Sequence, residues 1–118
     1  MSSGWTAPNL EHVTLDPEDS KIITLARAAR ARNGSAEGAA VRDETGRTYS
    51  ATNVALSALT LSAVQVAVAM AISSGAQSLE AVALVTAGDG PSAADEAVAA
   101  ELGVKALLVA GPDGTLRA

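Results

Sequence analysis

The chain has 118 residues, enough for one domain with a single core, and 48% of them are hydrophobic, which excludes a disordered chain. A formal net charge of −5 offers nothing that would attract a phosphate backbone, so nucleic-acid binding is not expected. The absence of cysteine excludes disulfides, thiolate metal ligands and a cysteine nucleophile.

Residues 1–15 have no apolar period and are expected to form a flexible N-terminal tail before a single domain over residues 16–118. This tail holds the only histidine and the only tryptophan of the chain. We expect His12 to be exposed to solvent, and Trp5 to pack on the surface or on a neighbouring subunit. The tail lacks the basic and apolar regions of a signal peptide, so a cytoplasmic protein is expected.

The first predicted helix begins after Asp16, whose side chain can accept a hydrogen bond from a free backbone N–H, and Pro17 suits the first helical position. An apolar stripe follows, and Asn33-Gly34 ends the helix. Residues 38–42 and 47–54 are then typical of two strands around a tight turn in which Gly46 supplies a positive φ. The polar face of this hairpin is expected to carry Arg42 and Arg47.

Residues 57–74 predict a second helix that is apolar on nearly every side, so one face can lie on a sheet and another needs a neighbouring helix or a second subunit. Residues 79–86 and 104–109 are typical of strands buried on both faces. A third helix from Ser92 to Leu102 joins them. Acidic residues in turns and at helix ends are expected to be solvated: Asp43, Glu44, Asp89, Asp95, Glu96 and Glu101.

This order of elements, with short motifs at set places, resembles the homotetrameric cytidine deaminases, a family of zinc-dependent nucleoside deaminases. The motifs that carry the resemblance are Gly38-Ala39-Ala40, Asn53-Val54, Leu59-Thr60, Pro91 and the turn Pro112-Asp113-Gly114. The resemblance implies an α/β fold, a three-layer α-β-α sandwich with a mixed sheet. It also implies a homo-oligomer, a dimer or tetramer, that packs the second and third helices across subunits.

The resemblance also implies where a zinc site would lie. Zinc deaminases carry [HC]-x-E at the start of one helix and P-C-x-x-C at the start of the next. Here Ser62 and Ser92 stand for two ligands, Asp95 for the third, and Val64 for the glutamate that moves protons. One carboxylate beside two hydroxyls is a poor zinc site, so neither metal nor cofactor is expected. We interpret the serines as helix caps or polar packing residues, and Asp95 as an acid in the first turn of a helix.

In the family, the asparagine of N-x-E binds the nucleoside ribose, and in this chain Asn53 keeps that position while Ala55 has lost the glutamate. Asn53 therefore either retains weak nucleoside binding or ends a strand by bonding to local backbone. Both interpretations stay open from the sequence.

The sequence thus predicts a non-catalytic, cytidine deaminase-like subunit with a binding or structural role. It would assemble with itself, with a catalytic relative or with another protein, and not with nucleic acid or a membrane. One alternative is a nucleoside deaminase-type hydrolase with an atypical site. A second alternative is dinucleotide or phosphate binding at Gly88–Ala93, which imitates the G-x-G-x-x-A loop before a helix.

Overall fold

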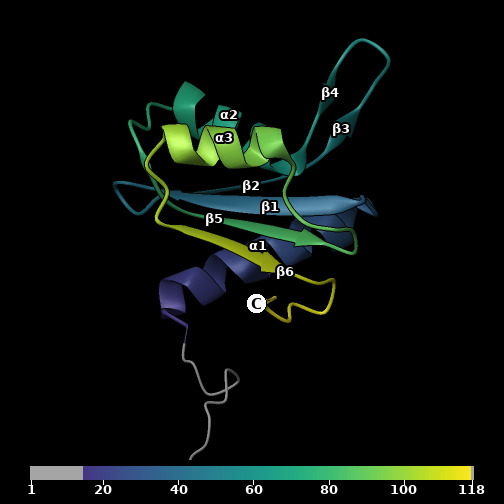
Figure 1. Cartoon of the computed structure of the whole chain (residues 1–118), viewed down its shortest axis with the longest axis horizontal. Helices are drawn as coiled ribbons and strands as arrows, with labels where there is room; N and C mark the ends of the chain where they lie inside the picture. The colour runs from purple at the N-terminus through teal and green to yellow at the C-terminus, as the bar shows by residue number, and fades with distance from the viewer. Residues whose placement is uncertain (1–14, 118) are drawn as a thin grey trace, which may run out of the picture.

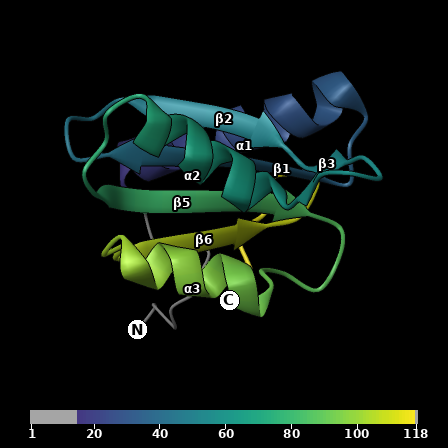
Figure 2. The same cartoon turned by 90° about the horizontal axis from the view of Figure 1, so that it is seen from above.

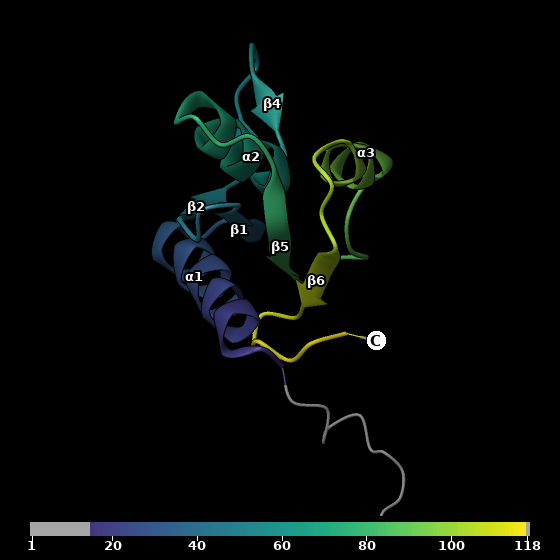
Figure 3. The same ribbon diagram turned by 90° about the vertical axis from the view of Figure 1, so that its left-hand side faces the viewer.

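The computed structural model describes residues 15–117, so the expectations for Trp5 and His12 lie outside the described residues. Its elements, in chain order, are α1 Pro17–Asn33, β1 Glu37–Asp43, β2 Thr48–Thr52, β3 Val54–Ala55, β4 Thr60–Leu61, α2 Ala63–Ser73, β5 Leu79–Thr86, α3 Ala93–Glu101 and β6 Ala106–Ala110. Helix α1 covers one face of the sheet, and α2 and α3 cover the other (Figures 1 and 3). The predicted three-layer α/β fold is confirmed.

The main sheet has the strand order β2-β1-β5-β6. Strand β1 pairs antiparallel with both β2 and β5, whereas β5 and β6 run parallel because α3 crosses between them. The predicted mixed sheet is therefore correct. No helix among residues 15–117 is long and apolar enough to cross a membrane.

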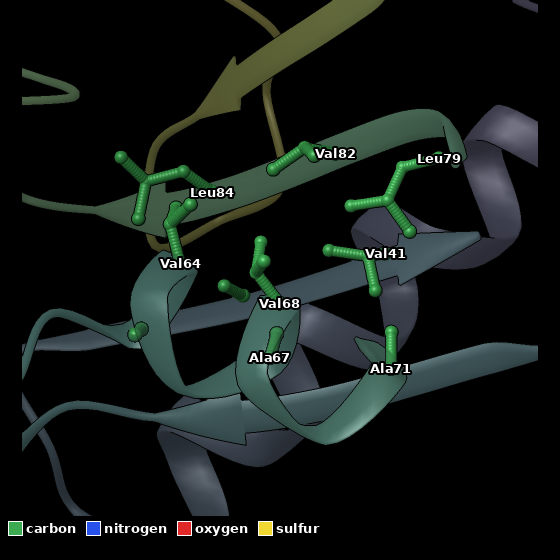
Figure 4. Close-up of a cluster of buried hydrophobic side chains, with 10 residues drawn as sticks. Val41, Val64, Ala67, Val68, Ala71, Leu79, Val82 and Leu84 are labelled. Carbon is green, nitrogen blue, oxygen red and sulfur yellow. The ribbon is translucent and has the colours of Figure 1, made fainter. Parts of the chain in front are cut away.

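Two apolar clusters lie on the two faces of the sheet. Alternation along β5 directs Val82 and Leu84 toward α2, and Ala81, Ala83 and Val85 toward α1. Figure 4 shows the α2 side, where valine, alanine and leucine side chains interdigitate without any aromatic ring among those labelled. Because these side chains are small, the helices approach the sheet closely.

Glycine at position 38 shows how close this approach is. A Cβ atom on Gly38 would lie 2.1 Å from the backbone oxygen of Ala26 in α1, a distance that no real contact allows. Helix α1 has the predicted ends, with Asp16 accepting from Glu18 N–H at 2.8 Å and Gly34 in the left-handed conformation.

One charged residue of the β1–β2 turn, Asp43, is buried where the sequence predicted exposure to solvent. Asp43 is only 2% exposed, so its predicted solvation is wrong. Arg42 forms ion pairs with Asp19 at 3.0 Å and with Glu80 at 2.9 Å. Arg47 is exposed, as expected.

The second predicted helix begins six residues too early. Residues 54–61 form the two-residue strands β3 and β4, a hairpin that stands out from the three layers (Figure 1). Its tip is closed by a hydrogen bond of 2.9 Å from Leu56 N–H to the Leu59 oxygen. The helix starts only after Ser62, where a capping box with Gln65 satisfies the first free amides.

Candidate functional site

Helices α2 and α3 begin at the same edge of their layer, next to the carboxyl end of β5 (Figure 2). Ser62 is the N-cap of α2 and accepts from Gln65 N–H at 3.1 Å. Ser92 is the N-cap of α3 and accepts from Asp95 N–H at 3.1 Å. The interpretation of both serines as helix caps agrees with this geometry.

Asp95 connects the two helix starts. The Ser62 hydroxyl donates to Asp95 Oδ1 at 2.5 Å, and Ser92 N–H donates to Asp95 Oδ2 at 3.2 Å. The residue is 1% exposed, so the expectation of a solvated carboxylate was wrong for Asp95 as well as for Asp43. Three of the four positions singled out in the sequence, Ser62, Ser92 and Asp95, therefore converge.

Val64 occupies the same turn of α2 but does not join this cluster. Its side chain is fully buried and points toward Leu84 of β5 in the core (Figure 4). A hydrocarbon in this place can neither accept nor donate a proton. The cluster of Ser62, Ser92 and Asp95 therefore has no acid–base group at position 64.

Sequence reasoning missed Glu37, the first residue of β1. Its Oε1 accepts from Ala63 N–H at 3.1 Å, which places a second carboxylate at the start of α2. The backbone N–H of Glu37 donates to the side-chain Oδ1 of Asn53 at 3.1 Å. Asn53 directly follows β2, so this bond links the end of β2 to the start of β1. The available signal was an acidic residue directly before the apolar run of residues 38–41. This contact agrees with the strand-ending interpretation of Asn53.

The donor set at the helix starts does not fit a zinc ion. Catalytic zinc sites use three protein ligands drawn from thiolate, imidazole and carboxylate, and this cluster offers one carboxylate and two hydroxyls. Both oxygens of that carboxylate already accept hydrogen bonds. Among residues 15–117, no group of three or more histidine, aspartate or glutamate side chains could hold a metal ion.

The loop over Gly88–Ala93 does not present a phosphate cradle. Gly88 N–H is bonded to Thr86 Oγ1 at 3.0 Å, and the amide of Ser92 is bonded to Asp95. The buried Asp95 carboxylate also places a negative charge at the start of α3, where a phosphate would have to lie. These contacts count against the second alternative.

Comparisons with known proteins agree with the architecture. A family model described as cytidine deaminase-like matches residues 15–114. The cytidine deaminase of Burkholderia pseudomallei has 27% identity and a TM-score of 0.69, over 82% of this chain and 87% of that one. That of Mycobacterium tuberculosis has 27% identity and a TM-score of 0.66, over 86% and 90%. At 23% identity, the Mycobacterium leprae enzyme (TM-score 0.66, over 86% and 93%) supports the fold alone. No curated protein matches the chain.

Proposed function

The chain belongs to the cytidine deaminase-like family, and from this premise we propose that it is a member without zinc chemistry that acts as an oligomeric binding or structural subunit. The observation that carries the proposal is the state of Asp95, the one carboxylate among the three positions that stand for ligands. Asp95 is buried, and each of its oxygens accepts a hydrogen bond from a helix cap. A metal at Asp95 would compete with these hydrogen bonds and would gain only two neutral hydroxyls as further ligands.

The lack of a proton carrier supports the same proposal. Deamination in zinc deaminases needs a glutamate that passes protons between water and substrate. Val64 holds that place and is part of the core. Glu37 is the other carboxylate near the start of α2. It accepts from the Ala63 amide there, and we assign it this capping role rather than proton transfer.

Two measurements on the purified protein test the proposal. Elemental analysis is expected to find zinc well below one ion per chain, and incubation with cytidine is expected to release no ammonia above the rate without protein. The cytidine deaminase of Mycobacterium tuberculosis serves as the positive control for the assay. Stoichiometric zinc together with turnover would overturn the proposal in favour of a deaminase with an atypical site.

Assembly into a homo-oligomer is the second part of the proposal, and the distribution of charge supports it. Residues 48–79 contain no charged side chain, although the chain carries a net charge of −5. Two copies of one acidic chain repel each other least where their uncharged segments, residues 48–79, face each other. Four large apolar side chains are exposed along this segment: Leu56 62%, Leu59 48%, Met70 40% and Ile72 42%.

Weak nucleoside binding at Asn53 is a further part of the proposal that calorimetric titration with cytidine can test. Binding heat that disappears in Asn53→Ala, with an unchanged circular dichroism spectrum, supports it. Absence of heat with the unaltered protein at millimolar cytidine counts against it, and Asn53 is then a strand-joining residue only.

A further inference from the structure

We infer that the Asp95 side chain holds the starts of α2 and α3 together through hydrogen bonds. This junction lies at the place where zinc deaminases hold their metal. The inference rests on the proposed absence of zinc and adds a positive role for the residue that replaces a ligand. A metal bound by residues from two helices ties those helices together. Here a carboxylate with two hydrogen bonds provides the connection.

The contacts of Asp95 reach beyond its own helix. The Ser92 amide is a local partner in the capping box of α3, but the Ser62 hydroxyl belongs to α2 and lies 33 residues away in the chain. The distance of 2.5 Å is that of a charge-assisted O–H···O⁻ bond, a class about twice as strong as bonds between neutral groups. Since Asp95 is 1% exposed, water does not compete for this bond.

Two helix starts meet at the Asp95 side chain. The N-terminus of a helix carries a partial positive charge, and here two helix starts are bonded to the same side chain. Helix α2 has no acidic residue in its own first turn. Two carboxylates from other elements lie at its start instead: Asp95 accepts from the Ser62 hydroxyl, and Glu37 accepts from the Ala63 amide. Asp95 is thus an internal anion shared by two helices.

Glu96 provides a matched control, because it is also an acid in the first turn of α3 but is exposed. Asp95→Ala removes a charge near the helix start together with the bond to α2 and the local bond from Ser92 N–H, whereas Glu96→Ala removes a charge alone. A comparison of the two variants therefore separates the hydrogen bonds of Asp95 from the general effect of a charge at the helix start, and the double-mutant cycle with Ser62 then isolates the bond between the helices.

Two experiments on the full chain test the inference. A double-mutant cycle of Ser62→Ala and Asp95→Ala, measured by urea unfolding, gives the interaction free energy between the two side chains. Ser62→Ala also removes the α2 cap, but this loss occurs both with and without Asp95 and therefore cancels. We expect Asp95→Ala to lower the folding equilibrium constant at least about tenfold, Glu96→Ala by less than about threefold, and the pair to be coupled by about fivefold or more. Hydrogen–deuterium exchange should rise in the first turn of α2 in Asp95→Ala and not in Glu96→Ala.

Additive effects in the cycle, or exchange that rises in α3 alone, would overturn the inference. If Asp95→Ala does not fold, Ser62→Ala decides: it must raise exchange in the first turn of α3, and unchanged exchange there contradicts the connection. Unfolding with and without EDTA separates the two proposals. A lower urea midpoint in EDTA indicates a bound metal and defeats the proposed function, whereas an unchanged midpoint with an additive cycle defeats only the role of Asp95.

Discussion

At the scale of single residues, Asp43 illustrates a buried carboxylate that stabilises a turn. Its Oδ1 accepts from Thr45 Oγ1 at 2.7 Å and from the amides of Thr45 and Arg47 at 2.9 Å, and the Tyr49 hydroxyl donates to Oδ2 at 3.3 Å. Burial alone would raise the pKa of Asp43, but these hydrogen bonds outweigh burial and hold its pKa below the usual value. The charged form is therefore favoured in the folded state.

This depressed pKa predicts a specific pH dependence. The stabilisation from Asp43 is fully present above its unfolded pKa of about 3.8 and is lost as the pH falls through the lower, folded value. Asp43→Asn should lower the free energy of unfolding by about 1–3 kcal/mol at pH 7, and by less as the pH falls below about 4. Urea midpoints of both proteins between pH 2.5 and 7 measure this; curves that stay parallel throughout would contradict it.

Val64 provides a second prediction at this scale. Because its side chain is fully buried among apolar groups, Val64→Glu places a carboxylate in the core. We expect a loss of about 3 kcal/mol or more in the free energy of unfolding, and no deaminase activity. Val64→Ile is the control that keeps the site apolar. A Val64→Glu protein as stable as the parent would show that position 64 faces the helix-start cluster after all.

At the scale of elements, the packing of α1 on β1 depends on Gly38. A Cβ atom there meets the backbone of Ala26, which cannot move aside without shifting the helix. Gly38→Ala should therefore cost about 3 kcal/mol in unfolding free energy. Gly88→Ala is the matched control, because its Cβ would meet only the Thr86 hydroxyl at 3.4 Å. Equal unfolding midpoints for the two variants would refute this explanation.

The same scale shows where sequence patterns fail. Caps and turn glycines predicted α1, the β1–β2 turn and α3 closely, because these signals are local. The β3–β4 hairpin was missed, since an apolar, uncharged run gives no period that distinguishes a short ribbon from the first turns of a helix. The capping box of Ser62 and Gln65 was the local sign of the true helix start.

At the scale of the whole molecule, the exposed hairpin bears on assembly. Leu56 and Leu59 are exposed at its tip, and we propose that a second copy covers them. The double variant Leu56→Ser, Leu59→Ser should shift the chain toward monomer at micromolar concentration, as measured by size-exclusion chromatography with light scattering. Leu116→Ser is the control, because this leucine is 39% exposed elsewhere in the chain. An unaltered chain that is already a stable monomer would contradict the proposal.

Long-range arrangement could be anticipated in part from the order of elements and in part through the resemblance. The order of helices and strands predicted the mixed sheet. The resemblance placed Ser62 near Asp95, although nothing in the local sequence links these two positions. The burial of Asp43 and Asp95 was not predictable from local rules, which expect acids in turns and at helix starts to be solvated. Each is buried because several donors from separate segments surround it, and that depends on the finished fold.

A connection made only of oxygen and nitrogen atoms has a chemical consequence. The chain has no cysteine, so the junction of Ser62, Ser92 and Asp95 contains nothing that peroxide can oxidise or that a competing ion can displace. Under the proposed function, its integrity would not depend on the supply of trace elements. The tie between α2 and α3 should therefore persist under oxidative stress or metal starvation, conditions in which a thiolate-ligated relative would lose its centre.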